Sequence, residues 1–469
     1  MTDLLADLVL AFTDKRAVFF IAAGCSTPSL IPSASKLAEQ VALRAYAGQS
    51  GTTFEGFKIE CFGETEPTLD KVADYFYQKD GRSIEGFARL VPFAEWRGRV
   101  PNEAHQAVIR LAMEGFYDKA ITTNWDTLIE AAASQLGCSI AVVRQAEDLY
   151  TSVDADLQLF KIHGCLSQLP SLIAATSQWD EETCLWAQPQ TEAAFHGSTV
   201  VFAGYSGSIE TISRSMERIA KWAPADVKHV VVDVMSWESF EQSAAEFVNA
   251  ANVDESQYDG RGAVHFFSEL LNRLIRLLVL ETLSREAERQ HSAIIELKAR
   301  DQPEDYTPPA QFVERIANSE GADLLLRTLL TAVGAYQPVN RNAALLGRVV
   351  AWVAYLSARG WNNVDGLPLM TNESGEWIYL AAGDLGAPAS KVARRVSEVL
   401  ASKADLRRLV LGRGERAVVT CIILAAAGSA RDLGSNGLLA DTARPDDLIQ
   451  GGRSPLVFRT EAEFLEEAG

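Results

Sequence analysis

The first half of the chain alternates short apolar runs with segments whose apolar positions have a helical spacing. Near-continuous apolar strands separated by helices are typical of a parallel sheet that helices cover on both faces. The pattern therefore predicts an α/β fold built on a Rossmann-like parallel sheet. The predicted strands are 17–24, 119–124, 157–164, 199–206 and 229–236, and each ends at Gly, Asn or Ser.

Farther along, the pattern becomes mostly helical. An apolar stripe at helical spacing predicts one long helix over 264–300. The polar, proline-bearing segment 299–311 has the composition of a linker. We therefore expect an α/β domain over 1–298, the linker over 299–311, and a mostly α-helical C-terminal domain over 312–469. The stripe consists of Phe267, Leu270, Leu271, Leu274 and Leu278.

The C-terminal domain has its own local patterns. The segment 372–383 predicts a small hairpin, and the apolar run 417–427 predicts a buried helix. That run is too short to cross a bilayer, which needs about 20 residues. The segments with a helical pattern are 324–336, 343–360, 390–403 and 415–428.

Composition narrows the class of protein. The chain has 469 residues and a net charge of −19, and an acidic surface repels the phosphates of nucleic acid. Its six cysteines are sparse and form no Cys-x-x-Cys pair, which suits reduced thiols in a cytoplasm. The start lacks the basic region and cleavage site of a signal peptide. We expect a cytoplasmic protein that contacts neither membrane nor nucleic acid directly.

Polar and small residues follow the predicted strands at their carboxyl ends, where ligands bind in open α/β sheets. After the first strand, a turn with Ala23, Gly24 and Ser26 would let backbone N–H groups approach a pyrophosphate. After the fourth strand, Gly204 and Ser206 would line a phosphate or a ribose. A tight turn without a ligand explains the first segment equally well, and a plain glycine loop explains the second.

The middle strands carry the residues with reactive or hydrogen-bonding side chains. Thr123, Asn124 and Asp126 follow strand 119–124, where the Asn amide can both donate and accept, and Asp126 can cap the next helix. His163 ends strand 157–164 and can accept a proton near neutral pH. A lone His is more often structural, but its place at the same edge as Asn124 favours a general base.

Taken together and in this order, the segments resemble the sirtuin family over about 17–280. The turn 22–26 is similar to the family's Gly-Ala-Gly-x-Ser, and Ile31-Pro32 follows as in its Gly-Ile-Pro. Residues 101–112 resemble the Pro-Asn-x-x-His stretch. The sequence TTNWD matches the Gln-Asn-Ile-Asp motif at Asn and Asp, KIHG matches the His-Gly motif, and GYS is similar to Gly-Thr-Ser.

The resemblance implies an enzyme that uses NAD as its substrate, with His163 as general base beside Asn124 and Asp126. It also implies that NAD lies against the residues of the two glycine segments and the strand end before Asn124. These implied cofactor-binding residues are Ala23, Gly24, Ser26, Thr123, Gly204 and Ser206.

The chain departs from the family's deacetylases in several places. They carry two Cys-x-x-Cys pairs after the His-Gly motif that bind zinc, whereas this chain has only Cys165 and Cys184 between His163 and Gly204. Two isolated cysteines cannot close a four-ligand site, so we expect no metal. Ser33-Ala34-Ser35 stands in place of Asp-Phe-Arg, and Ala22 in place of the first glycine.

The pattern looks like the divergent bacterial sirtuin-like domains of antiviral defence systems. That resemblance implies an NAD hydrolase that drains NAD on infection, an abortive-infection effector. An ADP-ribosyltransferase, a deacylase and a non-catalytic NAD- or ADP-ribose-sensing module stay open, as does a cyclic product. We expect either a homo-oligomer or a complex with an operon-encoded partner such as an ATPase or an Argonaute-type protein.

Overall fold

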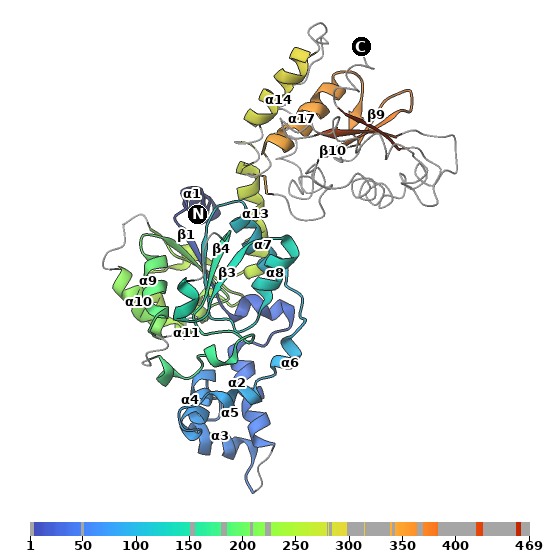
Figure 1. Ribbon diagram of the computed structural model, residues 1–469. Coiled ribbons are helices and arrows are strands. Elements are labelled where there is room, and N and C mark those ends of the chain that lie inside the picture. Colours follow the sequence, from blue (N-terminus) through green and yellow to red (C-terminus); the bar gives the residue numbers. More distant parts are fainter. Residues whose placement is uncertain are drawn as a thin grey trace. The chain divides into compact units, whose positions relative to one another are not determined.

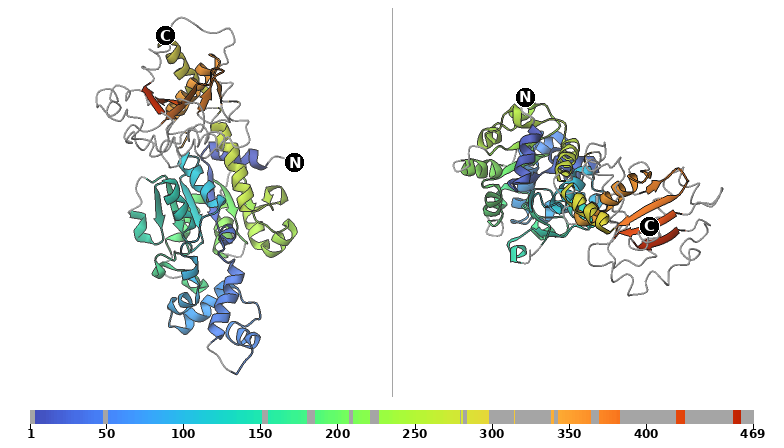
Figure 2. Two further views of the ribbon diagram at one scale, coloured as in Figure 1. Left: turned by 90° about the vertical axis from the view of Figure 1, so that its right-hand side faces the viewer. Right: turned by 90° about the horizontal axis from the view of Figure 1, so that it is seen from above.

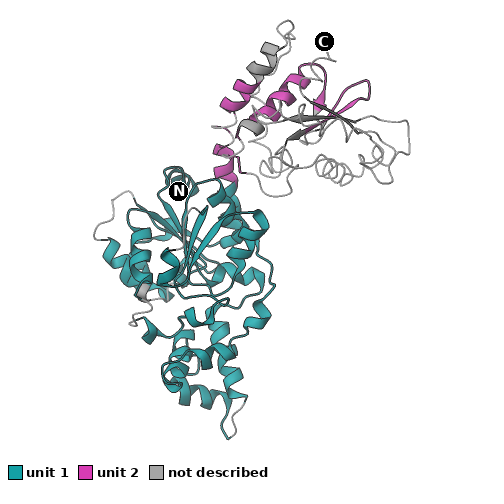
Figure 3. Ribbon diagram, viewed as in Figure 1, with its two compact units in different colours: residues 1–271 teal, residues 272–469 magenta. Residues whose placement is uncertain are grey.

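The computed structural model (Figure 1; further views in Figure 2) divides into two compact units, residues 1–271 and 272–469 (Figure 3). In the part that it describes, no helix is long and apolar enough to span a membrane. The expected linker, 299–311, lies outside the described residues, so the domain limits expected around it stay predictions. The described residues are 4–47, 51–150, 155–179, 185–206, 210–220, 227–278, 280, 284–297, 314, 338–339, 343–363, 369–382, 419–424 and 456–460.

Unit 1 is built on seven parallel strands in the order β3-β4-β2-β1-β5-β6-β7. The predicted Rossmann-like sheet is therefore confirmed, and each of the five predicted strands is present. Two edge strands, β3 and β7, were not predicted. The bounds are β1 Ala17–Ile21, β2 Lys119–Thr122, β3 Ile140–Val143, β4 Leu157–Lys161, β5 Thr199–Ala203, β6 Val230–Val232 and β7 Tyr258–Asp259.

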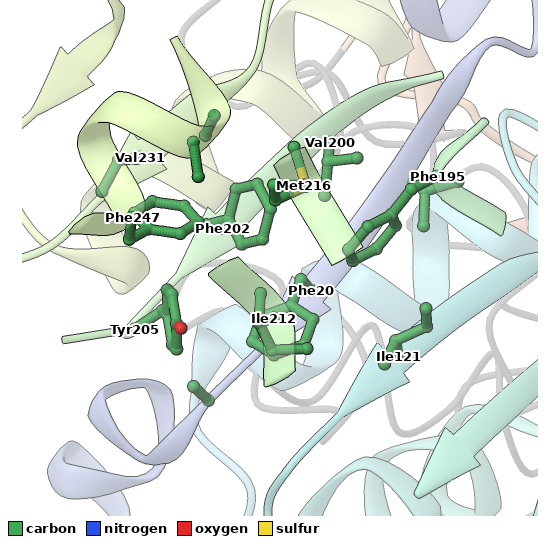
Figure 4. Packing of buried hydrophobic residues seen from close by; sticks show 14 of the residues in the cluster. Phe20, Ile121, Phe195, Val200, Phe202, Tyr205, Ile212, Met216, Val231 and Phe247 are labelled. Atoms are coloured by element: carbon green, nitrogen blue, oxygen red, sulfur yellow. The ribbon is translucent and has the colours of Figure 1, made fainter. Parts of the chain in front are cut away.

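Helices cover both faces of the sheet because successive side chains of a strand point to opposite faces. Phe19 of β1 packs against Phe267 with ring centroids 5.0 Å apart. Its neighbour Phe20 packs on the other face against Phe195 and Phe202, inside the apolar cluster of Figure 4. The covering helices are α1 Leu4–Thr13, α7 Glu103–Met113, α8 Leu128–Leu136, α9 Ala187–Phe195, α10 Glu210–Ala220, α11 Trp237–Ser243, α12 Ala245–Ala251 and α13 Ala263–Leu278.

A separate helical lobe, residues 34–96, is inserted between β1 and β2 and extends away from the sheet (Figure 1). Its apolar core includes Phe57, Phe76 and Phe87 and continues onto Trp125 and Leu166. Those last two residues follow β2 and β4, so the lobe packs against the carboxyl edge of the sheet. Its helices are α2 Ala34–Tyr46, α3 Phe54–Phe62, α4 Leu69–Lys79, α5 Glu85–Leu90 and α6 Phe93–Trp96.

The described part of unit 2 combines two further helices with a five-stranded sheet in the order β12-β11-β10-β9-β8. α17 confirms the helix predicted over 343–360. The hairpin predicted over 372–383 is present as the antiparallel pair β9–β10 but begins earlier, because β9 precedes residue 372. The bounds are α14 Ser284–Leu297, α17 Ala343–Ser357, β8 Asn362–Asn363, β9 Leu369–Thr371, β10 Trp377–Ala382, β11 Val419–Leu424 and β12 Leu456–Thr460.

One helix prediction is wrong, and three others are described only in part or not at all. The helix predicted over 415–428 is wrong where it is described, because 419–424 form β11, parallel to β10 and β12. A short apolar run rich in Val, Thr and Ile fits a buried strand as well as a buried helix, and the sheet decides. The long helix predicted over 264–300 is described as α13 and α14, and the helices predicted over 324–336 and 390–403 lie outside the described residues.

Candidate active site at the carboxyl edge of the sheet

The strand order reverses between β1 and β5. The chain leaves β1 toward β2 and leaves β5 toward β6, so the two loops diverge and open the crevice in which α/β sheets bind ligands. Gly24 and Gly204 lie there, and the Gly24 amide donates to the Gly204 carbonyl at 3.0 Å. A Cβ on Gly204 would come 2.4 Å from the Cys25 nitrogen, and φ at Gly204 is +65°. Two glycines are needed because the backbones touch.

Ser26 is fully buried and joins the first strand end to the second. Its Oγ donates to Asp126 Oδ2 at 2.8 Å, and Asn124 Nδ2 donates to that same Oγ at 3.0 Å. Asn124 Nδ2 also reaches the Ala22 carbonyl at 3.2 Å. The structure therefore brings together three residues that sequence analysis selected from segments about 100 positions apart.

His105 belongs to the same network and was missed by the sequence analysis. It lies in the first turn of α7, and its Nε2 is 3.4 Å from Ser26 Oγ. Asn102 caps that helix and donates through Nδ2 to the Cys25 carbonyl at 2.8 Å, which ties the helix to the glycine turn. Burial lowers the pKa of His105 to about 4. The Pro-Asn-x-x-His spacing of this stretch was the signal that could have found it.

Asn124 and His163 occupy equivalent places on neighbouring strands. β2 and β4 run parallel with Thr122 opposite Lys161, and each site residue follows its register partner by two positions. The Ile162 amide donates to the Thr122 carbonyl at 3.1 Å, so the pairing continues past the strand ends. The hydrogen bonds found for the Asn124 side chain go to Ser26 and Ala22 rather than to His163.

Each of these two residues keeps one buried polar atom without a hydrogen-bond partner in the described part of the chain: Asn124 Oδ1 and His163 Nε2. The His163 ring packs edge-on against Trp179 at 5.1 Å, and burial lowers its pKa to about 4. The imidazole is therefore neutral at physiological pH and can accept a proton. Buried polar atoms are normally paired, so these two atoms are exceptions, as are Trp125 Nε1 and Glu130 Oε2 in the described part of the chain.

The remaining predicted residues lie around this centre. Asp126 is buried and also caps α8 through Oδ1, which accepts from the Leu128 amide at 3.0 Å, as its helix-capping interpretation predicted. Ala23 opens the short 3-10 turn after β1, and the Thr123 amide continues the β1–β2 pairing by donating to Ile21. Ser206 is exposed beyond β5.

The described residues of the site do not form a cluster of metal ligands. In the described ranges, no group of three or more His, Cys, Asp and Glu side chains could hold a metal ion. Cys25 and Cys165 are buried, and burial raises the pKa of the Cys25 thiol well above its usual range. A protonated thiol of that kind behaves as a small apolar side chain.

Residues 118–254 match the family model of the SIR2-like domain. The matched stretch contains Asn124, Asp126, His163, Gly204 and Ser206, so the resemblance to the sirtuin family is supported there. The glycine turn after β1 lies before it. No curated protein is similar enough in sequence to match the chain.

Several solved structures are similar to part of the chain. One, on the basis of sirtuin substrate affinity, has 15% identity and a TM-score of 0.34, covering 57% of this chain and 97% of the other. A second, on the mechanism and regulation of Sir2 enzymes, has 17% identity and a TM-score of 0.34, covering 59% and 100%. A third, a Sir2 homologue–NAD complex, has 15% identity and a TM-score of 0.33, covering 59% and 95%.

Proposed function

We propose that the chain is an NAD hydrolase that cleaves the bond between nicotinamide and ribose and releases nicotinamide and ADP-ribose. The proposal depends on two buried polar atoms that have no hydrogen-bond partner in the described part of the chain, Asn124 Oδ1 and His163 Nε2. These two residues follow the neighbouring parallel strands β2 and β4. The SIR2-like match, which spans both residues, supports an NAD-dependent activity.

The reaction does not require a strong nucleophile from the protein. As the bond to ribose C1′ breaks, its electron pair leaves with neutral nicotinamide and the ribose becomes oxocarbenium-like. Water then bonds to C1′ and loses a proton, which the neutral His163 Nε2 accepts. Asn124 Oδ1 accepts a hydrogen bond from the water or from a ribose hydroxyl and orients it.

Asp126 supplies the negative charge of the site. Its buried carboxylate, fixed by Ser26 at 2.8 Å, would steady the positive charge that develops on the ribose or hold the nicotinamide amide. The pyrophosphate would lie at the crevice between β1 and β5, whose shape is fixed by the backbone contact of Gly24 with Gly204. Ala23, Ser26, Thr123 and Ser206 complete this proposed NAD-binding set.

The alternatives differ in what receives the ADP-ribose. An ADP-ribosyltransferase would use the same residues with another acceptor, and the missing Cys-x-x-Cys pairs disfavour a deacylase. A sensing module would bind NAD or ADP-ribose without cleaving it. The unpaired, neutral imidazole of His163 favours catalysis, because binding alone does not need a proton acceptor at that position.

We further infer that the activity serves antiphage defence in the cytoplasm and depletes NAD when triggered. A destructive hydrolase must be held inactive until it is needed. The C-terminal domain is the part of the chain that the sheet-edge site does not require, so we assign it to regulation, through a homo-oligomer or through an operon-encoded partner such as an ATPase or an Argonaute-type protein.

The test is to incubate the purified full chain with NAD, alone and with any operon partner, and to separate the products by chromatography. We expect equal amounts of nicotinamide and ADP-ribose with no acceptor added, or a cyclic form in place of the latter. Nicotinamide release that requires an added protein acceptor would indicate a transferase or deacylase instead. Calorimetric binding of NAD without release would indicate a sensor.

A further inference from the structure

A buried lysine lies directly beneath the proposed site. Lys161 ends β4, two residues before His163, and its side chain is 1% exposed. A lysine is almost never fully buried without a partner, because taking an ammonium group out of water is costly. The chemistry proposed above gives Lys161 no role, so the structure must explain this charge in another way.

Two acceptors surround the ammonium group. Lys161 Nζ donates to the main-chain carbonyl of Asp126 and lies 3.2 Å from Glu130 Oε1 in the first turn of α8. Burial lowers the pKa of Lys161, but the nearby negative groups, Glu130 foremost, raise it above its ordinary value. The lysine is therefore charged at neutral pH, and Glu130 balances that charge.

The carbonyl that Lys161 holds belongs to the loop that carries the site. The main chain of three consecutive loop residues is held by polar contacts, one from β2 and two from β4 and the segment after it. The Asn124 amide donates to Thr122 Oγ1 at 3.0 Å, the Trp125 carbonyl accepts from the Leu166 amide at 2.8 Å, and the Asp126 carbonyl accepts from Lys161.

Stability alone does not explain the choice of residue. Replacing a buried ion pair with apolar side chains of similar size is often neutral or stabilising, so a Lys–Glu pair is a poor way to strengthen a core. An apolar side chain, however, cannot donate to a carbonyl. The contact that only Lys161 can make at this position is the one that fixes the main chain of Asp126.

We propose that Lys161 is a positioning residue: its buried ammonium group, balanced by Glu130, fixes the main chain of residues 124–126 so that Asn124 and Asp126 face the ribose. This inference rests on the proposed NAD hydrolase function. Asp126 then keeps its carboxylate on Ser26, and Asn124 keeps Oδ1 directed toward the ligand rather than into a protein contact.

The decisive variant is Lys161→Met combined with Glu130→Met, which removes both charges and leaves neither one buried alone. We expect a folded protein with a melting temperature close to that of the wild type. The rate constant kcat for nicotinamide release should fall about 100-fold, the usual result of misplacing reacting groups by about 1 Å. KM should change much less.

Two companion variants separate the carbonyl contact from the ion pair. Glu130→Gln leaves an acceptor for Lys161 and keeps its bond to Asp126, so we expect kcat within about tenfold of the wild type, since a neutral hydrogen bond still orders the side chain. Lys71→Met with Glu64→Met removes an exposed Lys–Glu pair of the helical lobe, 2.9 Å apart, and should change nothing.

A readout independent of activity is hydrogen exchange of the peptide over residues 122–130. Its Asn124 and Leu128 amides are bonded within the loop and should exchange faster in the double Met variant. A double Met variant with wild-type kcat and wild-type exchange would overturn the proposal, as would a kcat loss in Glu130→Gln as large as in the double variant. A wild type that releases no nicotinamide would refute the proposed function, while the exchange comparison would still decide the positioning role.

Discussion

The two halves of the sheet-edge site are built in opposite ways. At the β1–β5 half, Gly24 and Gly204 meet backbone to backbone, and the contact leaves no space for a side chain. At the β2–β4 half, Asn124 and His163 bring side chains to the same edge, and each keeps one buried polar atom unpaired. The first half is closed within the protein, whereas the second still has hydrogen bonds to make.

The difference indicates which half of the site would hold the ligand and which half would carry the proposed chemistry. A closely packed backbone turn, whose Gly24 and Gly204 amides already donate to protein carbonyls, fixes the shape of the crevice, so it suits a part of a ligand that is only held, such as a pyrophosphate. A buried polar atom without a hydrogen-bond partner destabilises the protein, and a ligand that hydrogen-bonds to that atom removes the cost. We therefore place the proposed chemistry at the β2–β4 half and the binding at the β1–β5 half.

The largest effect should come from the second half. For His163→Ala we expect nicotinamide release to fall by about 10²–10⁴-fold, the usual loss when a positioned base is removed. The loss of thermal stability should be limited to the packing of the ring against Trp179, because His163 Nε2 has no hydrogen-bond partner to lose in the described part of the chain. Asn124→Ala should also abolish release, although it removes the bonds to Ser26 and Ala22 as well.

The control for this experiment is His196→Ala, a substitution of an exposed histidine at the end of α9. Its turnover should match that of the wild type. Undiminished NAD loss by a folded His163→Ala protein would contradict the assigned role of general base.

A smaller effect, on stability rather than on chemistry, should come from the first half. In Gly204→Ala the new Cβ would lie 2.4 Å from the Cys25 nitrogen in a backbone with φ +65°. We expect a loss of at least about 1–3 kcal/mol in the free energy of unfolding, the cost of a strained backbone site. Urea denaturation measures it.

Gly197→Ala is the matched control, because Gly197 has a similar φ of +69° but nothing within 4 Å of the added Cβ. The difference between the two variants isolates the close approach of Gly204 to the glycine turn. Equal losses would mean that backbone conformation alone explains the requirement for glycine.

A further effect should appear in the pH dependence of stability. Burial lowers the pKa of His105, His163 and His229 to about 4 from an ordinary 6.5. Between these values the unfolded chain binds more protons than the folded one, so stability falls as the pH drops from about 6.5 toward 4. Each histidine contributes a slope of at most about 1.4 kcal/mol per pH unit.

His163→Gln should remove one histidine's share of that slope in urea titrations at pH 7, 6 and 5. An unchanged slope for His163→Gln would mean that the imidazole of residue 163 already titrates normally in the folded protein. That result would contradict the burial of the His163 side chain.

Much of this architecture could be predicted because the signal was local. Each of the five apolar runs selected as strands became one, since a strand buried on both faces must be apolar along its whole length. The strand β7, Tyr258–Asp259, was missed because it is only two residues long. The edge strand β3 was missed although its four residues are apolar and it is as long as β2. The apolar run at 419–424 was assigned to the wrong element because its length and composition suit both.

The sequence by itself determined which residues would lie at the ends of the strands, because strand ends are local features that polar and small residues terminate. Only the tertiary structure decided that β2 neighbours β4 in register, that Gly24 meets Gly204, and that His105 and Lys161 join the network. Strand order and register depend on pairings between distant segments, and no local pattern of apolar and polar positions contains that information.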